Sequence, residues 1–439
     1  MFKETSKELL DFLSKSPTAF HAVENYRQIL NADGFKELLE SEHWNIVPGG
    51  KYYVTRNNTS ILAFKVGTKL DNYSFNIVTS HTDSPTFKVK ENAEIEVKNK
   101  YTQLNTEGYG GMLCATWLDR PLSIAGRVLV SEGNSIVTKL LNIDRDLLMI
   151  PNVAIHMNRA ANDGFKYNLQ VDMLPLLSGG DDRQKDFKQI IADELGVKKE
   201  DILGHDLYLY NRMAPSIWGA NEEFISSGHL DDLQCGFASL KALLAGYNDE
   251  SIDIMACFDN EEVGSGTKQG ADSTLLRDTL TRINSALGKT EEDYHRALAS
   301  SFMLSADNAH AVHPNHPEHT DVTNCTYMNE GVVVKSHAGQ KYTSDGVSMA
   351  VVKSLASGAD VPLQYFANRS DKAGGSTLGN IAMAQASMNA VDIGLPQLAM
   401  HSSYETAGIK DTYYAISLMK ALFDSHIQET STHSLEIKR

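Results

Sequence analysis

The sequence predicts an α/β fold, an α/β/α sandwich whose central sheet is mixed and mostly parallel. Three observations lead to this prediction. After residue 215, short apolar runs alternate with helical stretches, which is typical of strands connected through covering helices. Two of these runs end in acidic residues, at the sheet edge where α/β proteins gather their ligands. From about residue 90 to residue 215, alternating β patterns replace this texture and indicate an insertion.

The expected elements begin with two helices in the first 30 or so residues, broken at Ser16-Pro17 because proline disfavours helical backbone before it. KYYVTRNNTSILAFKV is typical of two strands around an Asn-Asn turn, and residues 75–80 of a buried strand. In the insertion, EIEVKNKYTQL, GRVLVSEG and SIVTKLLNI favour strands and KQIIADELGV favours a helix. Further strands are expected at SIDIMACFD, SFMLSAD, VVVK, PLQYFAN and AVDIGL, and helices at DGVSMAVVKSLASG and TYYAISLMKALFDSH.

These patterns predict a domain made of two parts, residues 1–90 and 216–439, separated by a β-rich unit at residues 91–215. The formal charge of −16 argues against nucleic acid and anionic membrane surfaces as partners, because both attract basic proteins. None of the four cysteines forms a C-x-x-C pair, and no apolar run approaches 18 residues. The amphipathic start lacks the apolar core of a signal peptide, so we expect a cytoplasmic protein.

Metal-capable side chains occur in five short motifs after strands or in turns. They are His81 and Asp83 in SHTDSP, Asp231 in GHLDDL, Glu261 and Glu262 in DNEEVGS, Asp307 in SADNAHAVH and His401 in AMHSSYE. Each residue alone is more often a surface or core residue than a ligand, so the prediction depends on the set. Imidazole and carboxylate suit zinc, and two histidines with three carboxylates could hold two ions if one carboxylate bridges them. Because Glu261 and Glu262 adjoin, one can bind metal while the other accepts a proton.

The motifs HTDSPTFKVK, GHLDDL, FDNEEVGS, SADNAHAVHPNHP and LPQLAMHSSYE resemble those of the M18 (aspartyl aminopeptidase-like) family, over nearly the whole chain. The resemblance implies a zinc-peptidase fold of the phosphorylase/hydrolase type and two Zn²⁺ ions per subunit. It also implies that a zinc-bound hydroxide removes the N-terminal residue of a peptide. The implied roles are Asp231 as the bridge, Glu262 and His401 at one zinc, His81 and Asp307 at the other, Glu261 as general base and Asp83 as an orienting carboxylate.

One departure from the family pattern concerns the bridging motif. It reads Leu-Asp-Asp where Leu-Asp-Asn is expected, so Asp232 adds a second candidate for the bridging carboxylate. Zinc itself is not the only metal compatible with these ligands, because cobalt or manganese suits them too.

The resemblance also implies a substrate site. Lys335 matches the family lysine that faces the substrate, and it favours an acidic N-terminal residue, although the sequence leaves this preference open. Gly375, Ser376 and Thr377 belong to a glycine-rich loop whose N–H groups could bind an anion; without the resemblance they are a helix N-terminus. His156, in the insertion, would reach the active site of a neighbouring subunit.

The insertion would then be a dimerisation domain, and the resemblance implies a homo-oligomer built of dimers, commonly a tetrahedral dodecamer. The tract His310, His313, His316 and His319 is interpreted as a loop lining the site, although alone it is also typical of metal binding. The closest alternative function is a related two-zinc carboxypeptidase or N-acyl amino acid amidohydrolase. An inactive scaffold and a structural-zinc module rank lower, because every ligand and the base are present and the cysteines are scattered.

Overall fold

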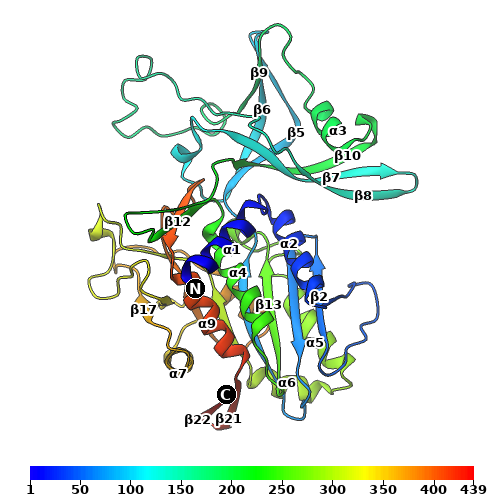
Figure 1. The fold of residues 1–439 in the computed structure, drawn as a ribbon, viewed down its shortest axis with the longest axis vertical. Coiled ribbons are helices and arrows are strands. Elements are labelled where there is room, and N and C mark those ends of the chain that lie inside the picture. Colours follow the sequence, from blue (N-terminus) through cyan, green and yellow to red (C-terminus); the bar gives the residue numbers. More distant parts are fainter.

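A nine-stranded sheet is the centre of the larger part of the molecule in the computed structural model, which describes residues 1–439 (Figure 1). From edge to edge the strands are β1 (Lys36–Glu37), β2 (Lys51–Arg56), β3 (Ser60–Val66), β13 (Ser251–Phe258), β4 (Ser74–His81), β14 (Phe302–Ala306), β18 (Asn389–Gly394), β16 (Val332–Lys335) and β17 (Leu363–Phe366). The four strands β13, β4, β14 and β18 are mutually parallel, whereas β2–β3, β3–β13 and β16–β18 are antiparallel pairs. The predicted mixed, mostly parallel sheet is confirmed.

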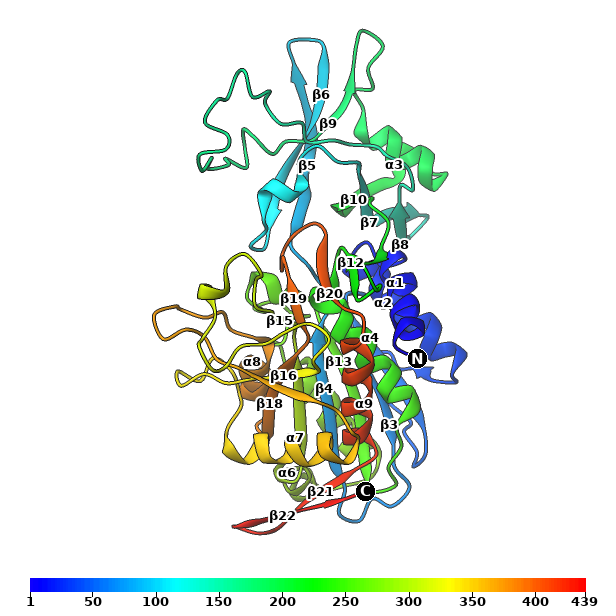
Figure 2. The same cartoon turned by 60° about the vertical axis from the view of Figure 1, so that its left-hand side comes forward.

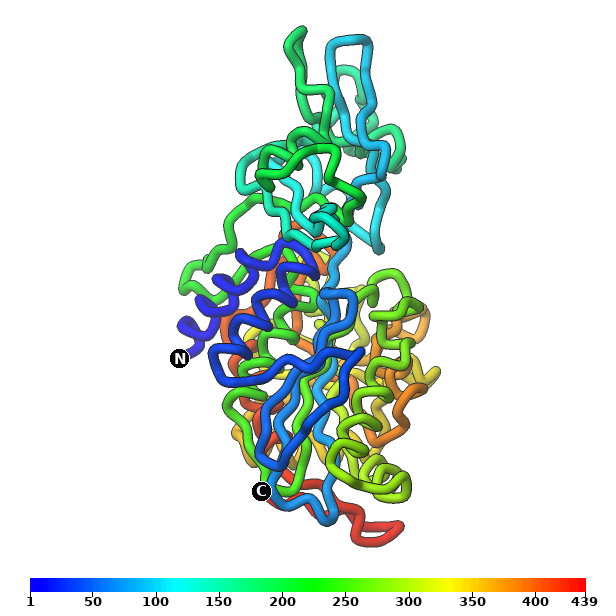
Figure 3. Tube along the Cα trace, turned by 90° about the vertical axis from the view of Figure 1, so that its right-hand side faces the viewer, coloured from blue at the N-terminus to red at the C-terminus, as the bar shows by residue number.

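Helices cover both faces of this sheet (Figures 2 and 3). One face packs against α1 (Phe2–Ser14), α2 (Ala19–Ala32), α4 (Leu230–Ala245), α7 (Gly346–Gly358) and α9 (Asp411–Phe423). The other packs against α5 (Leu275–Ala286), α6 (Glu291–Ala299) and α8 (Leu378–Gln385). Because strand side chains alternate between faces, Met255 of β13 joins the first core and its neighbour Ile254 joins the second. This arrangement is the predicted α/β/α sandwich.

The N-terminal predictions agree with the structure. The helices α1 and α2 are separated at Ser16-Pro17, and β2 and β3 pair around Asn57 and Asn58. Both asparagines have left-handed backbone, with φ of 59° and 57°, in a three-residue loop between the paired residues Arg56 and Ser60.

A second sheet, with six antiparallel strands, forms the upper part of the molecule (Figure 1). Its strand order is β8 (Ser135–Asn142), β7 (Leu122–Glu132), β10 (Ile202–Asn211), β5 (Thr86–Val97), β6 (Tyr101–Tyr109) and β9 (Leu176–Gly179). The helix α3 (Phe187–Leu195) packs on it, and 21 buried residues form a hydrophobic core separate from the two above. The strands and the helix expected in the insertion are therefore present, while the domain boundaries at 90/91 and 215/216 stay predictions.

Two features were not expected from the sequence. A small five-stranded sheet lies between the two parts (Figure 2), with strands β11 (Ser216–Trp218), β12 (Phe224–Ser227), β20 (Glu405–Gly408), β19 (Pro396–Leu398) and β15 (Ala309–His310). The last predicted helix was too long, because α9 ends at Phe423. His426 instead begins a hairpin of β21 (His426–Ser431) and β22 (Ser434–Lys438), where its buried ring contacts Ser74 and Ser251.

No helix in the structure has both the length and the apolar content needed to cross a bilayer.

Candidate metal centre

Six of the predicted site residues meet at the carboxyl ends of the central parallel strands. His81 is the last residue of β4, Asp307 directly follows β14, and Glu261 and Glu262 form a short turn after β13. Asp231 is in the first turn of α4, and His401 is in the turn between β19 and β20. Parallel strands end at one edge of a sheet, which is why residues so distant in sequence lie together.

Asp231 lies between the two histidines. Its Oδ1 is 3.5 Å from Nε2 of His81, and its Oδ2 is 3.4 Å from Nε2 of His401. Glu262 Oε2 is 3.3 Å from the same nitrogen of His401. The possible ligand atoms of Asp231, His81 and Asp307 lie within 4.8 Å of one another, and so do those of Asp231, Glu262 and His401. The two triads therefore share one carboxylate, Asp231.

Both histidines are oriented by hydrogen bonds from their other ring nitrogen. Nδ1 of His81 donates to the backbone carbonyl of Asp83 at 3.0 Å, and Nδ1 of His401 donates to that of Gly111 at 2.8 Å. A neutral imidazole that donates through Nδ1 has a free lone pair on Nε2. This is the usual way in which a protein fixes the tautomer of a metal-binding histidine.

The charge balance of the cluster fits divalent cations. Burial raises the pKa of Glu261 to about 8 and that of Asp307 to about 6, and it raises the pKa of Glu262 strongly. Asp231 Oδ1 and Glu262 Oε1 are buried without a hydrogen-bond partner. Buried carboxylate oxygens without a partner are costly unless a cation compensates them, and oxygen with imidazole nitrogen is a donor set that suits zinc. The residues present thus fit the zinc ions that the resemblance implies.

Asp231 and Asp232 have different surroundings. Burial favours the neutral acid of Asp231, but the imidazoles of His401 and His81 beside its carboxylate outweigh burial and lower the pKa of Asp231. Asp232, in contrast, accepts the backbone N–H of His81 at 3.2 Å, and its pKa is raised by burial. Only Asp231 faces both histidines.

The carboxylate of Asp83 holds the turn that carries the two glutamates. Its Oδ1 accepts the backbone N–H of Glu261 at 3.1 Å, and its Oδ2 accepts that of Glu262 at 3.2 Å. The hydroxyl of Tyr109 donates to the same Oδ2 at 2.7 Å, and Asp83 Oδ1 is also 3.4 Å from Nδ1 of His81. These contacts suit the orienting role expected of Asp83.

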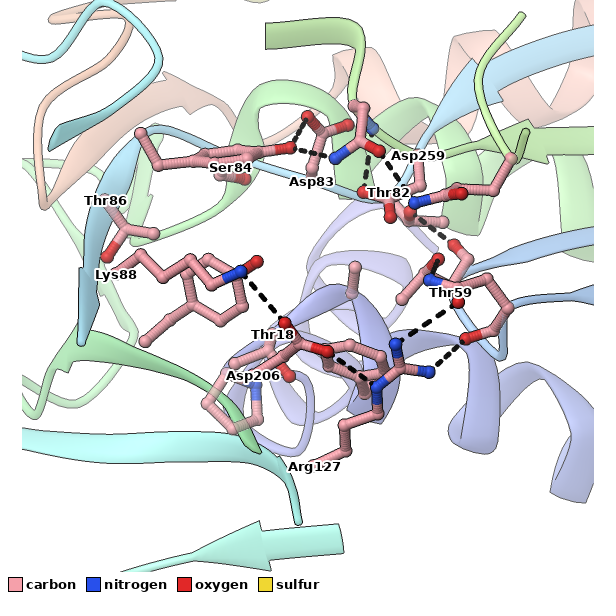
Figure 4. A pocket seen from close by; sticks show the side chains of 18 of the residues that line it. Thr18, Thr59, Thr82, Asp83, Ser84, Thr86, Lys88, Arg127, Asp206 and Asp259 are labelled. Carbon is pink, nitrogen blue, oxygen red and sulfur yellow. Dashed lines mark hydrogen bonds and ion pairs between the residues drawn. The ribbon is translucent and has the colours of Figure 1, made fainter. Parts of the chain in front are cut away.

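Asp83 also lines a cavity of about 290 Å³ between the two parts of the molecule (Figure 4). An ion-pair network crosses this cavity, in which Asp206 binds Lys88 at 2.9 Å and Arg127 at 2.8 Å. Arg127 also donates to the backbone of Asn57 at 3.0 Å, so it joins the six-stranded sheet to the β2–β3 turn. None of the six residues of the metal cluster lines this cavity. We therefore regard the cavity as a junction between the two parts.

Three residues of the site were missed in the sequence. Glu405 is buried and accepts the backbone N–H of Asp231 at 3.0 Å and of His401 at 2.8 Å. Its position four residues after His401, in the same motif, was a usable signal. Tyr109 and Gly111 come from the end of β6 and the segment after it, and nothing local in their sequence connects them to the site.

The predicted substrate residues are less closely grouped. Lys335 is buried, donates to the backbone carbonyl of Asn308 at 2.8 Å and lies 3.9 Å from Asp307 Oδ1. Thr377 precedes α8, but its hydroxyl donates to Asp392 at 2.5 Å instead of capping the helix. Gly375 and Ser376 lie in the loop before it. His156 is exposed in a turn of the insertion, on the segment between β8 and β9.

The fold and this cluster together define the class of α/β metallohydrolases. The sequence profile described as "Aminopeptidase I zinc metalloprotease (M18)" matches residues 12–423. A probable M18 family aminopeptidase 2 from Clostridium novyi (strain NT) is 48% identical over 425 residues, which are 95% of this chain and 98% of that protein. The chain therefore belongs to the M18 family of zinc-dependent aminopeptidases, which are enzymes that hydrolyse peptides.

Solved structures agree with this assignment. Ape4, in a cryo-EM structure of its complex with Nbr1, has a TM-score of 0.93 and 35% identity, covering 96% of this chain and 86% of that one. The mApe1 dodecamer of S. cerevisiae has a TM-score of 0.84 and 28% identity, covering 96% and 97%. The fold class expected from the sequence is confirmed.

Proposed function

We propose that this enzyme removes N-terminal residues from peptides with two zinc ions and a glutamate base. The observation that carries the proposal is the position of Asp231, 3.5 Å from His81 and 3.4 Å from His401. Asp231 with Glu262 and His401 would hold one ion, and Asp231 with His81 and Asp307 would hold the other. When bound, the zinc ions supply Lewis acidity toward the scissile carbonyl and lower the pKa of water.

Glu261 is the proposed general base. Its carboxyl group belongs to the same cluster as His81 and Glu262, and Asp83 fixes its backbone. In hydrolysis it takes a proton from the attacking water and gives that proton to the leaving amine as the C–N bond breaks. Burial raises the pKa of its carboxyl group to about 8, nearer to neutral pH, where one group can both accept and donate a proton.

Lys335 is the proposed source of a preference for acidic N-terminal residues. The cation is buried and has one hydrogen bond, to the carbonyl of Asn308. An ammonium group has three donors, so it can still bind a carboxylate from substrate. In the glycine-rich loop before α8, the backbone N–H groups of Gly375, Ser376 and Thr377 are the proposed anion donors, while the Thr377 hydroxyl donates to Asp392.

Assembly through the inserted unit is a further part of the proposal. The segment between β8 and β9 exposes many large apolar side chains: Met149, Val153, Ile155, Met157, Phe165, Leu169 and Val171. Such a concentration of exposed apolar groups is typical of an interface. His156 lies within the same segment, so a dimer formed there would bring His156 toward a neighbouring subunit. We propose a homo-oligomer of such dimers, up to a dodecamer like that of mApe1. A cytoplasmic location stays a prediction.

The test is a panel of aminoacyl chromogenic substrates assayed with zinc-loaded wild type and with Glu261→Gln. We expect the variant to keep its zinc, measured by mass spectrometry of the metal, and to lose about 10³-fold or more in kcat, since it cannot accept the proton. Wild-type turnover in the variant would remove Glu261 from this role.

The same panel separates the alternatives. An aminopeptidase needs a free α-amine, so N-acetylation of the substrate should abolish cleavage. Equal cleavage of the blocked peptide would favour the carboxypeptidase or N-acyl amidohydrolase function instead. Faster cleavage of Asp and Glu substrates than of Leu or Ala would support the role of Lys335.

A further inference from the structure

Three side chains on the loop that contains the histidine tract take no part in the catalytic cluster. His316, Glu318 and His319 lie on the loop between β15 and β16, and their side chains are 58%, 57% and 65% exposed. Glu318 Oε1 is 3.1 Å from Nδ1 of His316 and 3.9 Å from Nε2 of His319. All three possible ligand atoms lie within 4.8 Å of one another.

These separations are close to those of a zinc site. Around a tetrahedral ion with bonds of about 2.0–2.2 Å, neighbouring ligand atoms are roughly 3.3–3.6 Å apart. Small rotations of the two exposed imidazoles are enough to reach that spacing, and exposure means that they can rotate. Two imidazoles and one carboxylate are also the kinds of ligand that Zn²⁺, Ni²⁺ and Cu²⁺ prefer.

The backbone of the loop is already ordered in the required shape. Pro314 and Pro317 restrict it, and the N–H groups of His316 and His319 donate to the carbonyls three residues earlier, at 3.0 and 3.2 Å. The guanidinium of Arg369 donates to the carbonyl of Glu318. The rings of His316 and His319 stack with centroids 5.4 Å apart and an angle of 23°. A site formed on an ordered loop loses less conformational entropy when it binds.

His313 is not part of the set. Its Nδ1 accepts the N–H of Asn315 at 3.2 Å, so its proton is on Nε2 and neither nitrogen is free for a metal. The three remaining ligands leave one tetrahedral position open to water or to an external ligand. The loop borders a cavity of about 260 Å³ whose wall includes Ala399 and Met400, immediately before His401.

We propose that His316, Glu318 and His319 form an auxiliary metal site for Zn²⁺ or another divalent ion of similar ligand preference, at the rim of this cavity. The site shares no residue with the catalytic cluster, so it does not depend on the proposed function. Its exposure makes it an exchangeable site, which fills and empties with the free metal concentration.

The test compares untagged wild type with His316→Ala/His319→Ala, with His295→Ala as the matched control. His295 is a similarly exposed histidine beside a glutamate, 3.9 Å from Glu291, but it has no second imidazole. After equilibrium dialysis against buffered zinc, we expect the double variant to hold about one zinc ion fewer per chain than wild type and the control. Retention on immobilised Ni²⁺ should fall in the double variant alone.

A second measurement needs no variant. Diethylpyrocarbonate modifies accessible imidazoles, so the rate of modification of each histidine in zinc-loaded wild type can be followed by mass spectrometry. Further zinc should protect His316 and His319 several-fold and leave His295 unprotected. Equal zinc content in the variants, or absence of zinc-dependent protection at these two residues, would overturn the proposal.

Discussion

At the scale of single residues, the site depends on side chains that bind no metal themselves. His401 has left-handed backbone, with φ of 66°, a conformation that costs a non-glycine residue about 1 kcal/mol or more. Glu405 stabilises this turn through the N–H of His401 and, with its other oxygen, the N–H of Asp231. One buried carboxylate thus fixes the relative positions of the two ligands that would share a zinc ion.

Replacing Glu405 with Gln should weaken metal binding without unfolding the protein. The amide keeps the volume but presents one acceptor instead of two, so one of the two backbone N–H groups loses its partner. Outer partners of metal ligands typically contribute about 10- to 100-fold in affinity, and we expect a loss in that range. Zinc affinity measured by chelator competition checks this, with the exposed Glu292→Gln as control. An unchanged affinity would assign Glu405 a purely structural role.

At the scale of elements, the ends of β4, β13 and β14 bring the ligands together, and the end of β6 closes the site from the inserted unit. Tyr109, the last residue of β6, binds Asp83, and Gly111 binds His401. The inserted unit therefore contributes to the geometry of the site within one chain, whatever its part in assembly.

The helix α2 carries a pH-sensitive residue away from the metal cluster. Burial lowers the pKa of His21 to about 4, and its Nδ1 shares a hydrogen bond with Thr18 Oγ1 at 2.8 Å. Its ordinary value is 6.5, so the folded state disfavours the protonated ring. The stability that depends on neutral His21 is complete above pH 6.5 and is lost as the pH falls toward 4.

We therefore expect His21→Asn, which retains a polar group near Nδ1, to lose less stability than wild type on acidification. Between pH 7.5 and pH 4.5, the unfolding free energy of wild type should fall by roughly 1–3 kcal/mol more than that of the variant. Thermal unfolding of both proteins at each pH measures it, and the comparison cancels any shared effect of metal release. Parallel pH profiles would contradict the interpretation.

At the scale of the whole molecule, the chain has a formal charge of −16, yet one segment of the inserted unit exposes a concentration of apolar side chains. Val153 is 54% exposed and Met157 is 84% exposed, on either side of His156. Water-exposed apolar area of this kind is removed by association.

The double substitution Val153→Asp/Met157→Asp should break the proposed association of subunits through this segment. Two charges in a buried apolar interface are strongly unfavourable, so we expect smaller particles by light scattering after size-exclusion chromatography. Ile136→Asp, at an exposed apolar position on β8, is the control. If His156 of a neighbouring subunit serves the active site, the double variant should also lose activity while it keeps its zinc. Full activity from the smaller species would refute that role.

The sequence by itself determined the sheet, the covering helices and the set of metal-capable residues, because alternating apolar runs and strand-end carboxylates are local patterns. It could not determine which carboxylate faces both histidines, since Asp231 and Asp232 are adjacent and chemically identical. It also could not find Tyr109 and Gly111, or the short strands of the five-stranded sheet. These depend on contacts between separate elements of the chain, 26 positions apart for Tyr109 and Asp83 and 290 positions apart for Gly111 and His401. Only the tertiary structure decides them, because chain packing fixes directions and distances that a linear pattern does not contain.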